Sequence, residues 1–273
     1  MTQTPEFELF AIRYAHHDRR RRDNFIDGDP HDQMMALDYY LWVARRGEAV
    51  YVIDTGFDAA TAAQRGRTLL CDPGESLRAL GVDPDAVKDV IVTHLHYDHI
   101  GNFALFPNAR FHLQDAEMAY ATGRCMCHGR LRHSYEVEHV AGIVRCLYQE
   151  RVCFHEGDEE ITPGLSVHLI GGHTGGLQWV GAQTRGGAVV PASDATHHYE
   201  HFETRRPFPN VVRVDQMIAG YDKLHALASS PRHIIPGHDP RVMQRYPAAS
   251  AELEGACVRL DVEPRDDRSE ARP

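Results

Sequence analysis

The stretch Val92-Thr93-His94-Leu95-His96-Tyr97-Asp98-His99-Ile100-Gly101-Asn102 decides the fold of this chain. Four of its side chains can bind a metal ion: His94, His96, Asp98 and His99. They follow directly after the apolar run Asp89-Val90-Ile91-Val92, which is typical of a buried strand. So many potential ligands at a strand end are hard to explain by packing. The stretch therefore predicts a metal site at the edge of a sheet, with further ligands elsewhere in the chain.

The composition of the chain is that of an ordinary globular protein. It has 273 residues, of which 42% are hydrophobic and 25% charged, and its formal net charge is −10 at pH 7. The acidic balance argues against a nucleic-acid partner. The basic run Arg19–Arg22 goes against this average and is predicted to be a solvated loop. No apolar stretch approaches the length of a membrane span, so we expect no membrane partner.

The N-terminus and the cysteines bear on the cellular location. Residues 1–6 lack the charged and apolar regions of a secretory signal. Without such a signal, the six scattered cysteines are expected to be reduced thiols, which predicts a cytoplasmic protein. Cys125-Met126-Cys127-His128 could suggest a second metal site, but its spacing is not that of a zinc finger.

Strands with interspersed helices are predicted along the chain. Apolar patterns predict strands at 7–15, 37–44, 49–54, 87–93, 110–113, 165–170, 177–182, 188–191 and 233–235, and helices at 59–65, 74–80, 115–121, 134–148 and 214–228. This order suits two sheets covered by helices in a single domain over residues 1–260. The charged, proline-containing tail 261–273 is predicted to be disordered.

Three further candidate ligands also stand at the ends of predicted strands. His173 lies in a glycine-rich turn, Asp194 follows the strand at 188–191, and His238 follows the last strand. Because all of them follow strands, they could converge on one edge of the sheets. Asp54 has a similar position, and we expect it to accept a hydrogen bond from a ligand histidine and so to orient the ring.

This pattern resembles the metallo-β-lactamase superfamily over roughly residues 7 to 245. The resemblance rests on His94-x-His96-x-Asp98-His99, on His173, Asp194 and His238 at suitable spacings, and on the element Asp54-Thr55-Gly56. It implies an α/β (α+β) fold, a four-layer αββα sandwich with two divalent metal ions, most often Zn²⁺, at one edge. It also implies the ligand sets: His94, His96 and His173 for one ion, Asp98, His99 and His238 for the other, and Asp194 as a bridge.

Within the superfamily the chain is most similar to the N-acyl homoserine lactonase group, which also includes pyridoxolactonase-like enzymes. The similarity lies in residues 94–102, in Ser193-Asp194-Ala195 and in Pro236-Gly237-His238-Asp239. Lactonases of this group usually carry a tyrosine three residues after the bridging aspartate. Here that position is His197, followed by His198 and Tyr199. His197 and Tyr199 are therefore candidates for the acid or oxyanion-stabilising role.

The resemblance implies a hydrolase that opens a lactone ring. A hydroxide that bridges two metal ions would attack the carbonyl of an N-acyl homoserine lactone or a related small lactone. His197 or Tyr199 could protonate the leaving ring oxygen, and Asp98 could pass a proton while acting as a ligand. Loop 16–36 and the insert 118–150 are candidate walls of the substrate pocket. The sequence leaves open whether the chain forms a homodimer.

Other functions stay open at this point. A thioesterase of the glyoxalase II type, or another ester or amide hydrolase, would require the same chemistry of the metal ions. A secreted β-lactamase would normally carry a signal, and an RNA-processing nuclease would need a basic surface. Redox di-iron relatives replace the second histidine of the cluster by glutamate, whereas this chain has His96. A non-catalytic binding module would not need a complete set of ligands.

Overall fold

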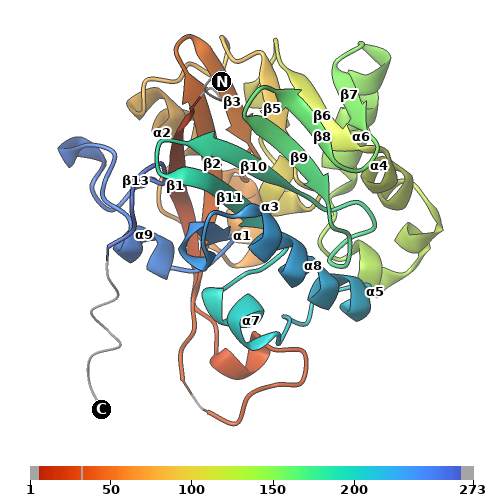
Figure 1. Ribbon diagram of the computed structural model, residues 1–273. Helices are drawn as coiled ribbons and strands as arrows, with labels where there is room; N and C mark the ends of the chain where they lie inside the picture. Colours follow the sequence, from red (N-terminus) through yellow and green to blue (C-terminus); the bar gives the residue numbers. More distant parts are fainter. Residues whose placement is uncertain (1–5, 32, 266–273) are drawn as a thin grey trace.

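A computed structural model describes residues 6–31 and 33–265 of the chain (Figure 1). Its strands are β1 (Glu8–His17), β2 (Leu37–Arg46), β3 (Ala49–Ile53), β4 (Thr68–Leu69), β5 (Asp89–Ile91), β6 (Arg110–Gln114), β7 (Val152–His155), β8 (Glu159–Thr162), β9 (Leu165–Leu169), β10 (Gln178–Thr184), β11 (Gly187–Ser193), β12 (Ile234–Pro236) and β13 (Cys257–Arg259). Its α-helices are α1 (Ala59–Arg65), α2 (Pro73–Ala79), α3 (Tyr97–Ile100), α4 (Asp115–Ala121), α5 (Gly129–Arg132), α6 (Val137–Tyr148), α7 (Tyr199–Thr204), α8 (Val214–Leu227) and α9 (Arg241–Arg245). Short 3-10 turns lie at Arg21–Asp23, Phe103–Leu105, Arg124–Cys127, Pro231–His233 and Ala251–Leu253.

The strands form two sheets. The first has the order β13-β1-β2-β3-β5-β6-β7, with β4 paired to β1, and the second has the order β12-β11-β10-β9-β8. β3, β5, β6 and β7 run parallel to one another, and β11 pairs in parallel with β12. Parallel strands end at the same edge of a sheet. The segments that follow β3 and β5 therefore lie side by side, as do those that follow β11 and β12.

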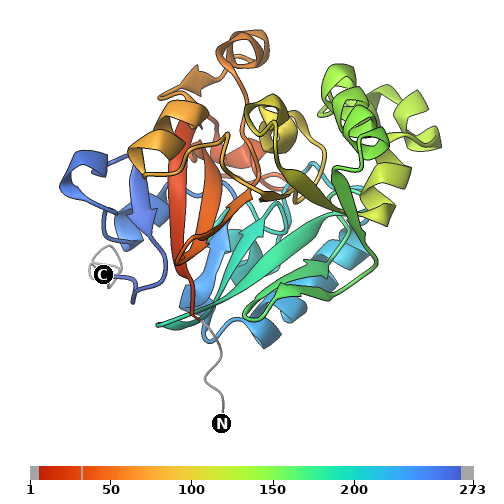
Figure 2. The same ribbon diagram turned by 90° about the horizontal axis from the view of Figure 1, so that it is seen from above.

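Alternation of side chains along β2 builds the core on both faces of the first sheet. Tyr40 and Trp42 belong to the cluster that contains Trp179 of the second sheet, while Leu41 belongs to the cluster that contains Ile143 of α6. Figure 2 shows the two sheets face to face, with helices on both outer sides. The four-layer αββα sandwich expected from the sequence is therefore confirmed.

Most predicted elements appear with small shifts at their ends. The predicted helices at 59–65 and 115–121 coincide with α1 and α4. The strand predicted at 87–93 shortens to β5, but Val90, Ile91 and Val92 are fully buried, as its continuous apolar run indicated. β4, β7, β8 and β13 were not predicted.

The basic run Arg19–Arg22 is less solvated than predicted. Arg21 forms an ion pair with Asp29 and with Glu200 at the start of α7, and Arg19 is half-buried. The prediction of a simple solvated loop is therefore wrong for these two arginines. Loop 16–36 can pack against the rest of the domain only if its buried guanidinium groups have ion-pair partners or line a cavity.

The domain boundary at residue 260 remains a prediction. Asp261, just past it, is buried and its carboxylate lies 2.6 Å from the Arg259 guanidinium. Residues 266–273 of the predicted tail lie outside the described residues. Among the helices in the described part of the chain, none is long and apolar enough to cross a membrane.

Candidate metal centre

The structure brings all seven predicted metal ligands to one edge of the sandwich. They lie just after β5 and in α3, and just after β9, β11 and β12: His94, His96, Asp98, His99, His173, Asp194 and His238. Two groups result, one of His94, His96, His173 and Asp194 and one of Asp98, His99 and His238. Within each group the potential ligand atoms lie within 4.8 Å of one another.

Hydrogen bonds at the outer nitrogens orient three of these histidines. The Nδ1 atom of His99 lies 2.7 Å from Asp54 Oδ2, and that of His238 lies 2.9 Å from the carbonyl oxygen of Asp38. The Nδ1 atom of His173 lies 2.5 Å from the carbonyl oxygen of Asn210. With these oxygens as acceptors, each Nδ1–H donates, which leaves Nε2 as the nitrogen that faces the centre and can bind a cation.

Three ring nitrogens of the first group face one another closely. His173 Nε2 lies 3.2 Å from His94 Nε2 and 3.0 Å from His96 Nδ1. Burial, together with the neighbouring imidazoles, holds the pKa of His94 and His96 well below the usual value, so both rings are neutral. Neutral imidazole nitrogens that converge on one point are the donor set of a divalent cation such as Zn²⁺. The residues therefore fit the metal that the sequence predicted.

Asp194 lies between the two groups. Its Oδ2 is 3.1 Å from His173 Nε2, and its Oδ1 is 3.0 Å from His238 Nε2 and 3.4 Å from His99 Nε2. The Nε2 of His99 is buried and has no hydrogen-bond partner. Burial lowers the pKa of His99, but Asp194 and Asp98 outweigh it and hold that pKa well above its usual value. The second group thus also attracts positive charge.

Asp54 takes the position that the sequence predicted for it. Besides His99, its carboxylate accepts hydrogen bonds from the backbone nitrogen and the hydroxyl of Thr93, each at 2.8 Å. Thr93 Oγ1 in turn accepts from Ser193 Oγ at 2.9 Å, which ties the first sheet to the second. Asp54 and Ser193 adopt left-handed backbone angles, with φ of 62° and 47°. Strain of this kind in residues other than glycine is typical of functional sites.

Of the two candidate proton donors, the structure brings only His197 to this site. His197 Nε2 lies 3.0 Å from Asp194 Oδ2, and its ring stacks on Phe208 at 3.4 Å. Tyr199 is fully buried in the core, with its ring 3.9 Å from the Arg245 guanidinium, and it does not line the cavity above the metal centre.

Glu117 of α4 is a buried residue that the sequence analysis missed. Its Oε1 accepts hydrogen bonds from Leu95 N at 3.0 Å and from Tyr135 Oη at 2.9 Å. Its Oε2 accepts from Thr174 Oγ1 at 2.6 Å and from Gly176 N at 3.1 Å. One carboxylate thus joins the loop after β5 to the loop after β9. A side chain at Gly176 would place its Cβ 2.0 Å from Glu117 N. The glycine-rich turn was therefore the one sequence feature that could have indicated this close contact.

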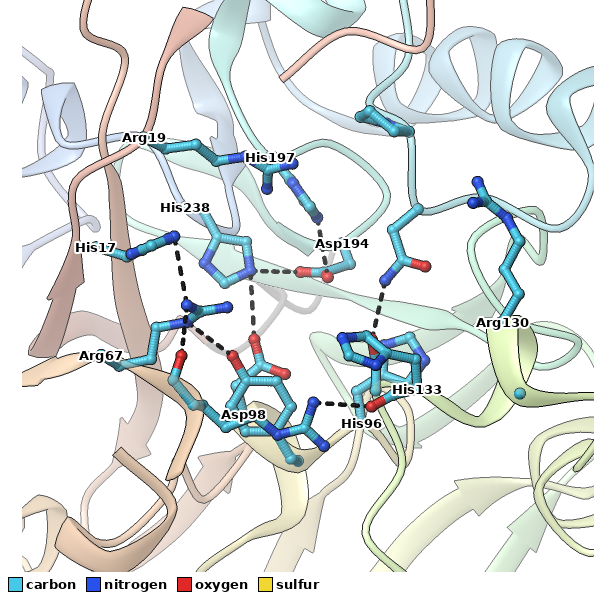
Figure 3. A pocket seen from close by; sticks show the side chains of 16 residues that line it. His17, Arg19, Arg67, His96, Asp98, Arg130, His133, Asp194, His197 and His238 are labelled. Carbon is cyan, nitrogen blue, oxygen red and sulfur yellow. Dashed lines mark hydrogen bonds and ion pairs between the residues drawn. The ribbon is translucent and has the colours of Figure 1, made fainter. Parts of the chain in front are cut away.

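A cavity of about 620 Å³ opens above the metal centre. Figure 3 shows Asp98, Asp194, His96, His197 and His238 at its base. Its rim carries six basic side chains, of which the sequence analysis named only Arg19, as part of the basic run: His17, Arg19, Arg65, Arg67, Arg130 and His133. Both segments predicted as walls contribute, because His17 and Arg19 belong to loop 16–36, and Arg130 and His133 belong to the insert 118–150.

A second cluster of potential ligands lies on β6 and β7. His112, Cys153 and His155 bring their ligand atoms within 4.8 Å of one another. His112 Nδ1 lies 3.0 Å from His155 Nε2, and the outer nitrogens of the two rings reach Asp89 and Glu159, so hydrogen bonds already engage all four nitrogens. Cys125, Cys127 and His128 belong to no such group within the described residues.

Comparison with known proteins agrees with the fold. Residues 37–238 match the family model of the metallo-beta-lactamase superfamily. An N-acyl homoserine lactonase of a Bacillus species is 31% identical over 157 residues, which cover 57% of this chain and 53% of that relative. The match thus spans about half the length of that relative. A probable metallo-hydrolase of Mycobacterium tuberculosis is 22% identical over 247 residues, which cover 77% of each chain.

Solved structures give the same result for the fold. A quorum-quenching N-acyl homoserine lactone lactonase has a TM-score of 0.72 at 23% identity, covering 88% of this chain and 95% of that chain. A dizinc quorum-quenching lactonase in complex with a product has a TM-score of 0.68 at 18% identity, covering 87% and 89%. Because the family model spans most of the chain and the architecture agrees with it, the chain belongs to the metallo-beta-lactamase superfamily.

Proposed function

We propose that this protein is a metal-dependent hydrolase with two divalent cations, most simply Zn²⁺, and that it opens the ring of a small lactone. The position of Asp194 between two groups of ligand atoms supports the proposal most strongly, because one carboxylate can then serve both cations. The lactonases among the relatives support the reaction class. When bound, two such cations supply an activated water at neutral pH and polarise a carbonyl group.

The proposed roles of the side chains follow from their positions. His94, His96 and His173 would hold one cation, Asp98, His99 and His238 the other, and Asp194 both. Asp54 keeps His99 in the tautomer whose Nε2 is free, through the 2.7 Å contact at Nδ1. Asp54 also accepts a hydrogen bond from the backbone nitrogen of Thr93 and so fixes the chain directly before the ligand stretch.

Proton transfer is assigned to Asp98. Its side chain lines the cavity, and its Oδ2 lies 3.7 Å from His99 Nε2 and 3.9 Å from His238 Nε2. An oxygen in this position can take the proton of the attacking water and deliver it to the ring oxygen that leaves. His197 acts as a positioning residue. Burial lowers its pKa well below the usual value, so its neutral ring donates Nε2–H to Asp194 and is a poor acid.

The test is a metal analysis followed by a hydrolysis screen of the same preparation. We expect close to two metal ions per chain, and hydrolysis of lactones in preference to thioesters, simple esters and β-lactams. One ion or none after gentle purification would contradict the two-cation assignment. Faster turnover of a glutathione thioester than of any lactone would replace the proposed reaction by that of a thioesterase of the glyoxalase II type.

A further inference from the structure

The rim of the cavity has an unusual excess of positive charge. Figure 3 shows His17, Arg19 and Arg67 on one side of the metal centre, and Arg130 and His133 on the other. Among the described residues, the carboxylates that line the cavity are Asp98 and Asp194, which belong to the candidate metal centre. The whole chain has a net charge of −10, so this local excess is not a consequence of composition. A concave site lined by one sign of charge attracts the opposite sign.

Among the described residues, three of these arginines have no carboxylate partner, and two of the three, Arg19 and Arg67, are half-buried. In the described part of the chain, no carboxylate lies within 4 Å of the Arg19 or Arg67 guanidinium. Arg67 contacts only neutral acceptors: Tyr97 Oη at 3.2 Å, His17 Nε2 at 3.3 Å and the carbonyl oxygen of Arg65 at 2.7 Å. Arg19 donates to the carbonyl oxygen of Asp23. Half-buried guanidinium groups are usually paired, so this arrangement favours the binding of an anion.

The groups around these arginines do not neutralise them. Burial and then the nearby Arg67 and Arg19 lower the pKa of His17 to about 4, so its ring carries no charge at neutral pH. Arg65 differs from its neighbour, because Glu136 pairs with it. Arg130 has no carboxylate partner among the described residues, but it is exposed to solvent. The half-buried positive charge without a carboxylate partner therefore lies on Arg19 and Arg67.

The cavity also offers little to an alkyl chain. In the part of the chain that the structure describes, no leucine, isoleucine, valine, methionine or phenylalanine lines it, and the apolar contribution comes mainly from the Tyr97 ring and Pro209. A long acyl tail would remain in contact with guanidinium and imidazole groups, where it gains little from burial. The side chains that line the cavity are thus suited to bind a charged group rather than an alkyl chain.

We infer that the substrate is a small lactone that carries an oxyanion, a carboxylate or a phosphate, and that Arg19 and Arg67 bind this group while the metal centre acts on the ring. The inference rests on the proposed function and names its substrate class. His17 assists, because its Nε2 accepts from Arg67 and its Nδ1–H is then free to donate. Planar guanidinium groups bind carboxylates and phosphates through paired hydrogen bonds.

The experiment compares lactones that differ only in charge. The zinc-loaded enzyme is assayed with 5-oxotetrahydrofuran-2-carboxylate, with its neutral methylamide, and with the same ring carrying a phosphonate. We expect kcat/KM for one of the two anionic rings to exceed that for the methylamide at least about tenfold, with the excess falling as salt is added. The anionic ring with the higher kcat/KM shows whether Arg19 and Arg67 prefer a carboxylate or a phosphate-like group. Equal values for all three rings would overturn the inference.

Substitutions test which side chains cause the preference for an anionic ring. Arg67→Gln and Arg19→Gln should each lower the ratio of kcat/KM for the preferred anionic ring over the neutral ring about tenfold, and Arg67→Lys should restore part of it. Arg185→Gln is the matched control, since Arg185 is an exposed arginine in the β10–β11 turn, and its ratio should equal that of the wild type. A ratio that stays unchanged in both cavity variants, in protein with normal metal content, would overturn the inference.

A binding measurement separates this inference from the proposed function. Calorimetry with 2-hydroxyglutarate, the ring-opened form of the carboxylate, is carried out on the wild type and on Arg67→Gln. Binding that weakens in the variant, in a protein that hydrolyses no lactone, would support the anion site and refute the lactonase. Hydrolysis of the neutral ring, with binding equal in both proteins, would support the lactonase and refute the anion site.

Discussion

Asp194 is the residue on which the proposed chemistry depends most, because it lies between both groups of ligands. Asp194→Asn keeps the shape of the side chain but removes the charge that two cations would share. We expect metal content to fall below two ions per chain and kcat/KM to fall roughly a hundredfold or more. Asp222→Asn is the control, since Asp222 lies exposed on α8 and pairs only with the exposed Arg205. Normal metal content and turnover in Asp194→Asn would refute the bridging role.

His197 and Tyr199 should behave differently when substituted. His197→Ala removes the hydrogen bond to Asp194 Oδ2, and we expect kcat to fall about tenfold because the carboxylate loses its orientation. Tyr199→Phe removes a hydroxyl that lies outside the cavity, so turnover should stay near that of the wild type. Steady-state kinetics on one lactone measures both. A larger loss in Tyr199→Phe would reverse the assignment.

At this scale the sequence predicted which side chains converge on the candidate metal centre, but it did not separate the two candidate proton donors. The converging side chains could be found because His94, His96, Asp98 and His99 are close in sequence and follow a recognisable strand. His197 and Tyr199 could not be distinguished, because their directions depend on where α7 begins. The helix starts at Tyr199, which turns its ring into the core, whereas His197 lies in the preceding turn.

The elements that carry the ligands are joined by Glu117, and this gives a prediction for α4. Glu117→Gln places an amide group where both carboxylate oxygens accept hydrogen bonds, so at least one donor among Leu95, Thr174 and Gly176 loses its partner. We expect a loss of about 1–3 kcal/mol in the free energy of unfolding and weaker metal binding. Calorimetry and a zinc competition titration measure these quantities. Glu138→Gln, on the exposed face of α6, is the control; equal effects in both variants would contradict the linking role.

The loop 16–36 is attached to α7 by charge, which makes its attachment sensitive to acid. The Arg21 guanidinium lowers the pKa of Glu200 and of Asp29 below their ordinary values of 4.5 and 3.8. Carboxyls with a lowered pKa stabilise the folded state above those ordinary values, and the contribution is lost as the pH falls through the lowered ones. We therefore expect hydrogen-exchange protection in residues 20–31 to stay constant from pH 7 to about pH 4.5 and to decrease below that pH, earlier than in β2. Arg21→Gln should show the decreased protection already at pH 7, and unchanged protection would contradict the attachment.

Periodicity predicted the long elements and missed the short ones for a physical reason. β2 and α8 have enough residues for an apolar pattern to emerge. β4 and β13 have two and three residues, and they are strands only because β1 offers them backbone partners. Pairing between segments so distant in sequence leaves no local signal.

The proposed cations connect the two halves of the sandwich, so their removal should destabilise the whole molecule. Chelation leaves several imidazole nitrogens and carboxylates converging without a counter-charge. We expect the unfolding midpoint to fall, by the equivalent of about 4 kcal/mol if free metal had been a thousandfold above Kd. Differential scanning calorimetry before chelation, after chelation and after addition of zinc measures the effect. Identical midpoints in all three states would contradict it.

The basic rim of the cavity could not be predicted from the sequence. His17, Arg67 and Arg130 belong to three segments, and each reads locally as an ordinary solvent-exposed residue. Their proximity depends on the way in which loop 16–36, the segment after α1 and the insert before α6 surround the metal centre. The proposed selectivity for the substrate therefore depends on the assembled fold, whereas the stretch 92–102 alone indicates the reaction class.

The hydrogen bond between Thr93 and Ser193 spans the seam between the sheets, directly beside the ligands. Neither half of the sandwich holds a complete set of donors, because the residues after β5 supply one part and those after β9, β11 and β12 the other. If the proposed cations bind here, a nascent chain would hold them tightly only after its second sheet has docked, and metal uptake would follow assembly of the sandwich.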